Sequence, residues 1–259
     1  MLAWLRKMRF GTWNLDGLVA VGGVAEIWRG TRDGVQAAVK AMHTHLLRND
    51  DARAQFAIEQ QLTTTLPQHP NVVRGLEAGD VDGRPYLAVE IAPGEDVRRM
   101  LGPQVVLPRG RALAIVRAAC EAAAHLHDAG YVHGDINPGN LVVDVDDRVT
   151  LIDLGVARRV GEGGNVRGTH AYMAPEQVRG EAWTPATDVF ALGVLLWELV
   201  AGERLFHRGP PWLSMAAVME VTPPPLADPL LDAIAQHALA KEAAKRTVTA
   251  RALADRLLR

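Results

Sequence analysis

The sequence is short of cysteine, of net charge and of long apolar runs. Among 259 residues there is one cysteine, Cys120, so no disulfide can form within the chain and no cysteine-based zinc site is available. Lysine and arginine total 28 against 30 acidic residues, a net charge of −2. This balance argues against a nucleic-acid or membrane-surface role that depends on bulk positive charge. The lone cysteine also fits a reducing, cytoplasmic location.

No stretch of the sequence is typical of a transmembrane segment. The most apolar run, residues 189–201, is too short to cross a bilayer and contains Glu198, so it predicts a buried central helix. The first ten residues lack the continuous apolar core of a signal peptide. They predict an N-terminal extension over residues 1–14, with one helical turn, and not a membrane anchor.

What is present divides the chain into two patterns. With 48% apolar and 22% charged residues, the composition is that of a globular protein, and the length suits one core with two lobes. Residues 15–90 hold short β-like runs separated by turn signals. One helix, from about Asp50 to Thr65, interrupts these runs and is ended by Pro67. The first lobe is therefore predicted to be a small sheet with one helix.

The remainder of the chain is predicted to be mainly helical. Long helical patterns cover residues 111–130, with Gly130 as the stop, and residues 188–202, and two more helices are expected near the end. A hinge at about residues 90–94 would join this lobe, residues 95–259, to the first. The predicted fold class is α+β.

Five side chains spread along the chain suit phosphoryl transfer, which needs cations on the phosphates and a group that orients the attacking hydroxyl. Lys40 closes a β-like run, and Glu59 in the next helix could hold its ammonium, although the two alone read equally as a surface pair. Asn140 and Asp153 are oxygen ligands suited to Mg²⁺. Asp135 is left to accept or align the proton of a substrate hydroxyl.

These residues stand in segments that resemble the protein kinases, in particular the eukaryotic-like serine/threonine kinases of bacteria. AAVK, ending at Lys40, resembles the family's lysine motif, and FAIEQQL resembles the helix that carries the partner glutamate, here Glu59. YVHGDINPGN, residues 131–140, resembles the catalytic loop H-R-D-x-x-x-x-N. DLG, residues 153–155, stands where D-F-G is expected.

Three later segments extend the resemblance to about residues 15–259. GTHAYMAPE, ending at Glu176, resembles the segment up to A-P-E, and DVFALGVLLWEL resembles the central helix with its aspartate, Asp188. KEAAKRT carries Arg246, which in the family pairs with the A-P-E glutamate. The resemblance implies the bilobal protein-kinase fold, with an antiparallel sheet and one helix in the N-lobe and a mainly helical C-lobe. It also implies ATP and Mg²⁺ as cofactors and a protein as substrate.

The resemblance assigns nucleotide contacts to several positions of the first lobe. The phosphate-covering loop, G-x-G-x-x-G in the family, here has alanine at the first and third glycine positions and keeps only the middle one, Gly22. Because that glycine approaches the phosphates most closely, we expect ATP binding to survive with a stiffer loop. The predicted nucleotide contacts, with the metal ligands, are Val21, Gly22, Gly23, Ala38, Lys40, Glu59, Val89, Glu90, Ala92, Asn140 and Asp153.

Two cations of the family's catalytic loop are missing. Gly134 replaces an arginine that grips a phosphorylated activation loop, and residues 154–168 contain no serine, threonine or tyrosine. The two absences agree, so we predict no activation by phosphorylation in that stretch. Asn137 replaces a lysine that contacts the transferring phosphate, at an expected cost of roughly tenfold to a thousandfold in rate. Thr169 is retained, which favours serine or threonine as the acceptor.

The remaining polar residues of this region read as structural. His133 is expected to pack and orient the loop, as its counterpart does in the family. His125 and His127 are expected to pack or face solvent and not to bind metal, since no carboxylate or cysteine completes a set. Gly139 stands where kinases that favour basic substrates place glutamate, so no preference for arginine-rich peptides is implied.

The sequence thus predicts a Mg·ATP-dependent serine/threonine protein kinase, with Asp135, Lys40, Asn137 and Thr169 as catalytic residues. A pseudokinase that serves as a nucleotide-binding scaffold is the alternative, opposed by the retention of all five phosphoryl-transfer side chains. A small-molecule phosphotransferase is a second alternative, suggested by HGD and Asn137 and opposed by Glu176, Asp188 and Arg246. A receptor's kinase domain is not favoured, because no transmembrane segment follows. Regulation is expected from the domain itself, from its N-terminus or from a separate protein.

Overall fold

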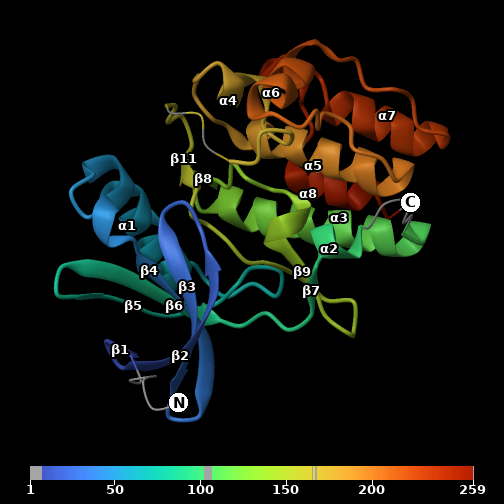
Figure 1. Cartoon of the computed structure of the whole chain (residues 1–259). Helices are drawn as coiled ribbons and strands as arrows, with labels where there is room; N and C mark the ends of the chain where they lie inside the picture. Colours follow the sequence, from blue (N-terminus) through green and yellow to red (C-terminus); the bar gives the residue numbers. More distant parts are fainter. Residues whose placement is uncertain (1–7, 102–106, 165, 167, 259) are drawn as a thin grey trace. The chain divides into compact units, whose positions relative to one another are not determined.

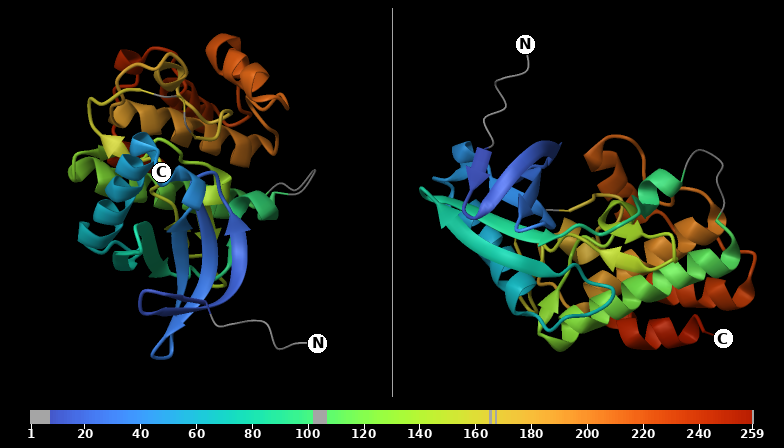
Figure 2. Two further views of the ribbon diagram at one scale, coloured as in Figure 1. Left: turned by 60° about the vertical axis from the view of Figure 1, so that its left-hand side comes forward. Right: turned by 90° about the horizontal axis from the view of Figure 1, so that it is seen from below.

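The computed structural model describes residues 8–101, 107–164, 166 and 168–258. The chain divides into two compact units (Figures 1 and 2). The first contains the chain through His69 together with Val73–Ala92, and the second contains Pro70–Val72 and the chain from Pro93 onwards. Each unit has the secondary structure that the sequence predicted, a sheet with one helix and a mainly helical body.

The first unit is built on a six-stranded antiparallel sheet that curls around its own core (Figure 1). The order of strands across the sheet is β1-β2-β3-β4-β6-β5, so each strand pairs with the one before it in the chain except β5, which follows β4 through α1 and lies beyond β6. The strands are β1 Met8–Phe10, β2 Trp13–Val21, β3 Ala25–Arg32, β4 Val35–Met42, β5 Gly75–Val81 and β6 Arg84–Glu90.

Helix α1, Asp50–Thr65, covers one face of this sheet and has the limits that the sequence predicted. It begins where the side chain of Asn49 accepts a hydrogen bond from the amide of Ala52 at 2.9 Å, which satisfies one of the free N–H groups of the first turn. It ends two residues before Pro67, as a proline requires of the residues ahead of it. Phe56 of the helix packs with residues of β4 and β6 in one buried cluster.

The N-terminal extension is not helical where the structure describes it. Met8–Phe10 form β1 and pair antiparallel with the start of β2, Phe10 opposite Trp13. Phe10 and Trp13 are buried, and the Phe10 ring meets the ring of Tyr86 edge-on at 5.5 Å between centroids. The prediction of a helical turn is therefore wrong for residues 8–10, because their aromatic side chain completes the sheet's core; residues 1–7 lie outside the described residues. The sequence also missed β5.

The second unit is mainly helical, with α3 and α5 at its centre (Figure 2). Its helices are α2 Val97–Met100, α3 Arg109–Asp128, α4 Pro175–Val178, α5 Pro185–Ala201, α6 Pro211–Glu220, α7 Pro229–Ala238 and α8 Ala250–Arg256. Helix α3 ends at Gly130, whose φ of +82° breaks the helix as predicted. Three α-helices, not the two predicted, follow α5 in the part of the chain that the structure describes.

Helix α5 is the buried central helix that its sequence predicted. Its residues from Thr187 to Leu199 are all buried, including the carboxylate of Glu198. Glu198 is tolerated there because the Tyr172 hydroxyl, the Arg204 guanidinium and the Leu205 amide donate to it. Within the described ranges no helix combines the length and the apolar character that crossing a membrane requires.

Two small sheets and three short 3₁₀ helices complete the structure. Strands β10, β9 and β7 form one sheet of the second unit, and β11 and β8 form the other. Their bounds are β7 Glu95–Asp96, β8 Tyr131–Val132, β9 Leu141–Val143, β10 Val149–Leu151 and β11 Arg158–Arg159. The 3₁₀ helices are η1 Thr44–Leu46, η2 Pro138–Asn140 and η3 Ala243–Lys245. Strands β8 and β9 flank the loop that contains Asp135.

A buried ion pair ties the start of α4 to the segment ahead of α8. Arg246 meets Glu176 through two contacts, Nη1 to Oε1 at 3.0 Å and Nη2 to Oε2 at 2.5 Å, and both residues are buried. The Thr187 hydroxyl donates to the same carboxylate at 2.9 Å. The pair that the resemblance implied is thus present, in the bidentate geometry that favours arginine.

We expect Arg246→Ala to lower the free energy of unfolding by about 3–5 kcal/mol, because it leaves the Glu176 carboxylate charged and buried. The measurement is the urea midpoint followed by tryptophan fluorescence. The matched control is Arg251→Ala, whose side chain is 55% exposed beside Glu121 and Asp128. That change should cost less than about 1 kcal/mol. Equal costs for the two variants would contradict the stabilising role of the buried pair.

Candidate active site

In the first unit, the lysine and glutamate that the sequence singled out form a buried ion pair. Lys40 lies on the interior strand β4 and Glu59 on α1, with Lys40 Nζ 2.5 Å from Glu59 Oε1. Their side chains are only 10% and 7% exposed. A buried ammonium needs a partner of opposite charge. Glu59 therefore supplies the opposite charge that the buried Lys40 ammonium needs and fixes the position of its side chain. The two residues are not a surface pair.

The glycine-rich segment forms the turn between β2 and β3. The amide of Gly22 donates to the Ala25 carbonyl at 2.9 Å, and His43 Nε2 lies 2.8 Å from the Gly22 carbonyl oxygen. A Cβ atom on Gly22 would come within 3.3 Å of the Ala25 carbonyl, whereas one on Gly23 would meet nothing within 4 Å. A Cβ atom at the retained glycine would thus make a tight contact within the turn, whereas one at Gly23 would not. Val21, ahead of it, is exposed.

The residues predicted to contact adenine occupy β4 and β6. Ala38 and Val89 are partners across these strands and belong to the cluster that contains Phe56 of α1. Val39 points to the opposite face and joins the buried cluster around Trp13. Val39 is therefore a core residue, and Ala38 shares its face with Val89.

The last residues of the first unit carry the predicted hinge contacts. The Glu90 amide donates to the Arg74 carbonyl at 2.9 Å, and the Glu90 carboxylate pairs with the Arg74 guanidinium at 3.1 Å. Ala92 follows at the end of the unit. These contacts fix the backbone of Glu90, while its role and that of Ala92 in binding a nucleotide stay predictions.

In the second unit, one buried carboxylate holds the loop from Tyr131 to Asn140. Asp188, at the start of α5, accepts the amide N–H of His133 on Oδ2 and that of Gly134 on Oδ1, both at 2.8 Å. Nε2 of His127 lies 2.8 Å from Oδ2. Burial by itself would raise the pKa of the Asp188 carboxyl, but the hydrogen bonds from His127 and the Gly134 amide bring that pKa below its usual range. Asp188 is therefore an ionised anchor for the loop.

Asp135 receives hydrogen bonds from three sides. Its Oδ1 accepts the Thr169 amide at 2.7 Å and Asn137 Nδ2 at 3.1 Å, and its Oδ2 accepts Asn140 Nδ2 at 3.1 Å. Burial raises the pKa of the Asp135 carboxyl above its ordinary value, although the hydrogen bond from the Thr169 amide lowers it. The negative charge of Asp153 adds to the rise. The structure thus brings together four predicted site residues around one carboxylate.

Asn140 and Asp153 stand at the same end of the β9–β10 hairpin. The amide of Ile152 donates to the Asn140 carbonyl at 2.9 Å, which places the two positions side by side. Asp153 Oδ1 accepts the Gly155 amide at 2.9 Å. Both side-chain hydrogen bonds of Asn140 use its nitrogen, on Asp135, so its amide oxygen can face a cation.

This donor set fits Mg²⁺, which takes oxygen ligands and usually binds one or two protein groups together with phosphate oxygens and water. In the described part of the chain, no cluster of three or more histidine, cysteine, aspartate or glutamate side chains could hold a metal ion by itself. A cation between Asn140 and Asp153 would therefore depend on further oxygens from a bound phosphate or from water.

Two histidines support the loop. His133 Nε2 lies 2.6 Å from the Asp153 carbonyl oxygen, and its Nδ1 accepts the amide of Asp135 at 3.1 Å. His133 thus has the packing and orienting role that the sequence predicted. His127 has a more specific role than the packing we predicted, since it binds Asp188. No local pattern could have indicated this contact, because 61 residues separate the two.

Gly134 is packed against an aromatic ring. It has a φ of +75°, and a Cβ atom there would lie 2.2 Å from Cζ3 of Trp183, a distance that no side chain tolerates. The Arg158 guanidinium lies over the same ring, 4.4 Å from its centroid. Trp183 therefore occupies the space beside position 134 where the family's arginine would begin.

The segment after Asp153 is tied to Trp183 by its backbone as well. The Trp183 amide donates to the Glu162 carbonyl at 2.9 Å, and the Gly161 amide donates to the Trp183 carbonyl at 2.8 Å. Nη1 of Arg158 donates to the Gly163 carbonyl at 2.8 Å. Protein groups thus hold this part of the segment in place; residues 165 and 167 lie outside the described residues.

The sequence missed one charged residue of this region altogether. Nη2 of Arg98, on α2, donates to Oδ1 of Asn137 at 2.8 Å. A cavity of about 360 Å³ is lined by Arg98 together with Asn137, Asn140 and Thr169. The short helix α2 carries no motif that would have pointed to this contact. The position that lacks the family's lysine is thus next to a different cation.

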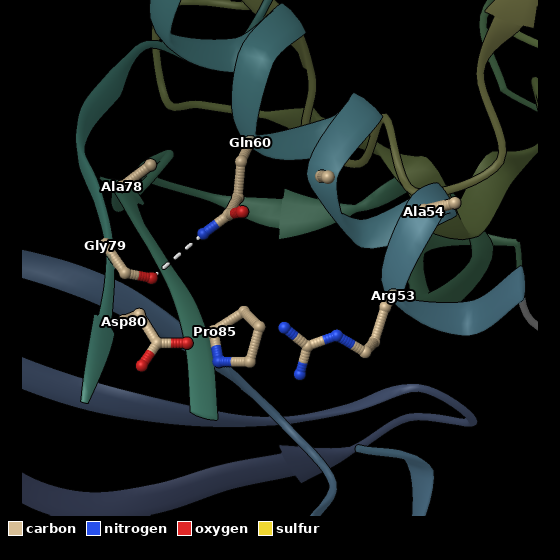
Figure 3. Close-up of a pocket in the computed structure, with 8 residues that line it drawn as sticks. Arg53, Ala54, Gln60, Ala78, Gly79, Asp80 and Pro85 are labelled. Carbon is tan, nitrogen blue, oxygen red and sulfur yellow. Dashed lines mark hydrogen bonds between the residues drawn. The ribbon is translucent and has the colours of Figure 1, made fainter. Parts of the chain in front are cut away.

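A larger cavity, of about 590 Å³, lies in the first unit between α1 and the β5–β6 hairpin (Figure 3). Gln60 crosses it and donates to the Gly79 carbonyl at 3.0 Å (Figure 3). Arg53 donates to the Gly83 carbonyl at 3.3 Å. Small residues such as Ala54 and Ala78 make up half of its lining. None of the predicted site residues lines this cavity.

Comparison with known proteins agrees with the motifs. Residues 14–253 match the family model of the protein kinase domain. The chain is 31% identical to the serine/threonine-protein kinase PknB of Mycolicibacterium smegmatis and 30% identical to PknB of Mycobacterium tuberculosis, in each case over 95% of this chain and 42% of the relative. It is 32% identical to the serine/threonine-protein kinase PknA of M. tuberculosis over 83% of this chain and 52% of the relative.

The chain therefore spans about half, or less, of the length of the curated relatives it matches. The family model, in contrast, extends over nearly the whole chain, from the first turn of the sheet to the last helix. The chain belongs to the protein kinase domain family.

Proposed function

We propose that the chain is a Mg·ATP-dependent serine/threonine protein kinase. The observation that carries the proposal is the environment of Asp135, a partly buried carboxylate that accepts hydrogen bonds from Thr169, Asn137 and Asn140. Such fixed donors orient an acceptor group without reorganisation during the reaction. The names of the relatives, which are serine/threonine-protein kinases, support the same conclusion.

In this proposal Asp135 accepts or aligns the proton of a serine or threonine hydroxyl. Lys40, paired with Glu59, binds phosphate oxygens, and the oxygens of Asn140 and Asp153 hold the cation. When bound, Mg·ATP supplies the phosphoryl group and the metal neutralises charge on the phosphate oxygens. The turn at Gly22 with its neighbours Val21 and Gly23 would cover the phosphates. Ala38, Val89, Glu90 and Ala92 would surround the adenine.

A protein is favoured over a small molecule as the substrate. Thr169 is fixed by its amide on Asp135, at the start of the segment that leads to Glu176. Glu176 in turn is held by the bidentate contact with Arg246. A rigid segment of this kind, anchored beside the reactive carboxylate, suits the docking of an extended peptide chain.

We expect the chain to transfer phosphate from Mg·ATP to a generic protein substrate or to itself. The measurement is incorporation of labelled phosphate, beside the variants Asp135→Asn and Lys40→Met. Both should abolish transfer, because the first removes the group that aligns the hydroxyl and the second removes the buried cation. If the wild type transfers nothing while Mg·ATP still raises its Tm, the chain is a nucleotide-binding pseudokinase instead.

We infer further that activity does not depend on phosphorylation between residues 154 and 168. No hydroxyl side chain is present there. The contacts of Trp183 with Arg158, Gly161 and Glu162 support an ordered segment without a phosphate. A phosphorylated loop is normally fixed by new pairs between phosphate and arginine. Here a tryptophan ring and backbone hydrogen bonds would serve the same purpose.

The Trp183 contact can be tested with two glycines of nearly equal backbone geometry. Gly134 has a φ of +75° and faces Trp183, whereas Gly34 has a φ of +81° and open space around it. Gly34→Ala should lower the free energy of unfolding by about 1 kcal/mol through backbone strain alone. Gly134→Ala should cost about 1–3 kcal/mol more, because the ring must move. Urea midpoints give both values.

A substitution at position 134 also tests whether activity depends on a phosphorylated segment gripped by an arginine. Gly134→Arg, which introduces the family's arginine, should reduce phosphate transfer instead of raising it, because the side chain cannot fit beside Trp183. Equal unfolding costs for Gly134→Ala and Gly34→Ala would contradict the steric argument. A phosphate found by mass spectrometry between residues 154 and 168, together with higher activity, would contradict the inference about regulation.

The raised pKa of Asp135 predicts the pH dependence of transfer. Asp135 acts in its ionised form, so activity is lost as the pH falls through its pKa. Because this pKa is raised, the loss occurs at a higher pH than for an ordinary aspartate, whose pKa is about 3.9. We expect kcat/KM to decline on acidification with an apparent pKa above that value. The pH profile of the wild type checks this, with circular dichroism to show that the fold persists. A flat profile down to the onset of unfolding would contradict the assignment.

A further inference from the structure

We propose that Arg98 supplies the positive charge that the loop lacks at Asn137, and that its guanidinium contacts the phosphoryl group during transfer. The inference rests on the proposed function and adds a catalytic residue to it. Arg98 comes from α2, 39 residues before Asn137 in the chain. It is therefore outside every motif by which the sequence was read.

The guanidinium of Arg98 is connected to the reactive carboxylate through one amide group. Arg98 Nη2 donates to Asn137 Oδ1 at 2.8 Å, and Asn137 Nδ2 donates to Asp135 Oδ1 at 3.1 Å. Asn137 is buried, and its Oδ1 also accepts the Gly139 amide at 2.9 Å. The asparagine is thus fixed on three sides, and it holds the arginine side chain at the edge of the site.

The absence of a side chain at Gly139 makes room for this arrangement. A Cβ atom there would lie 3.3 Å from Nε and 3.4 Å from Cζ of Arg98, and 3.1 Å from Oδ1 of Asn137. Contacts this short are tight, so a side chain at 139 would require the guanidinium or the amide to shift by a few tenths of an ångström. Glycine at 139 and asparagine at 137 therefore belong together, since one gives the arginine space and the other gives it a hydrogen-bond acceptor.

The charge of Arg98 is not neutralised by a neighbouring carboxylate. In the described ranges no ion pair involves Arg98, and the carboxylate nearest in the chain, Asp96, pairs with Arg99 at 3.3 Å instead. A guanidinium has five N–H donors, of which Asn137 takes one. The others can serve an anion that enters the cavity shared with Asn140 and Thr169.

The reaction needs a cation at this place. As Asp135 takes the hydroxyl proton, the substrate oxygen bonds to the γ-phosphorus, and the bridging oxygen leaves with its electron pair on ADP. Negative charge spreads over the phosphoryl oxygens on the way. Arg98 exchanges no proton and forms no covalent bond; its fixed charge lowers the energy of this state. A planar guanidinium fork also matches phosphate oxygens better than a single ammonium would.

The first test is the kinetics of Arg98→Ala. We expect kcat for phosphate transfer to fall roughly tenfold to a hundredfold, with KM for Mg·ATP nearly unchanged, because the contact is made in the transition state. The matched control is Arg109→Ala, whose guanidinium pairs with Asp228 at 2.7 Å and which does not line this cavity. It should leave kcat close to that of the wild type. Both variants should keep the wild-type Tm.

A second variant separates a catalytic charge from a structural support for Asn137. If Arg98 acts as the cation, Asn137→Lys in the Arg98→Ala background restores much of kcat, because it returns a charge to the same place from within the loop. If Arg98 only positions Asn137, the double variant stays as slow as Arg98→Ala, since the asparagine itself is then missing. The second result would overturn the proposal.

Binding of a transition-state mimic provides a readout that does not depend on turnover. Mg·ADP with tetrafluoroaluminate and a serine-containing peptide should raise the Tm of the wild type more than Mg·ADP with the peptide alone. We expect Arg98→Ala to lose this additional rise and to keep the shift given by Mg·ADP, whereas Arg109→Ala keeps both. An additional rise that Arg98→Ala retains in full would overturn the proposal.

The outcomes also distinguish the proposal from the function on which it rests. A wild type that transfers no phosphate overturns the proposed function, and the catalytic role of Arg98 with it. A wild type that transfers phosphate in an Asp135-dependent manner, with Arg98→Ala equally fast, overturns the role of Arg98 alone and leaves the function in place.

Discussion

The structure of the second unit depends on the hydrogen bonds that the buried Asp188 carboxylate makes to the loop ahead of Asp135. Both oxygens of Asp188 accept backbone N–H groups, those of His133 and Gly134. A buried charge is tolerable only when donors surround it, so loop and carboxylate stabilise each other. Because the amides of residues 133 and 134 are fixed, the side chain of Asp135 leaves the backbone at a fixed point. The donors on Asp135 then come from its own loop, through Asn137 and Asn140, and from the segment of Thr169.

The two cations missing from this loop are matched by groups from distant parts of the chain. At position 134 the space is filled by Trp183, whose backbone and ring hold the segment around Arg158. At position 137 an asparagine binds Arg98 of α2. In both cases a small or neutral residue of the loop contacts a larger or charged side chain from elsewhere in the chain. Each departure from the family pattern therefore goes together with a contact to a residue far away in the chain. Neither is merely the loss of a cation.

Sequence reasoning succeeded where the determining interactions are local. Helix α1 has its predicted limits because Asn49 caps it and Pro67 ends it, and α3 ends at Gly130 because only glycine adopts that backbone conformation readily. It failed where the partner is far away in the chain. Phe10 is buried only because β1 pairs with β2 beside Tyr86, and His127 gains its role only from Asp188. The motif residues of the site could be named in advance since the family resemblance placed them, but Trp183 and Arg98 lie outside those motifs and become visible only through contacts.

The division of labour between the two aspartates of this region follows from their surroundings. Asp188 is fully buried and Asp135 is partly buried, and burial by itself raises the pKa of any carboxyl group. At Asp188 the hydrogen bonds from His127 and from a backbone amide outweigh burial, so its pKa lies below the usual range and the ionised form is favoured. At Asp135 burial outweighs the Thr169 amide, and the charge of Asp153 adds to the effect, so its pKa is raised. A carboxylate with a lowered pKa is a poor proton acceptor and a good anchor. One with a raised pKa is a better base, which is the property that a group facing a substrate hydroxyl needs.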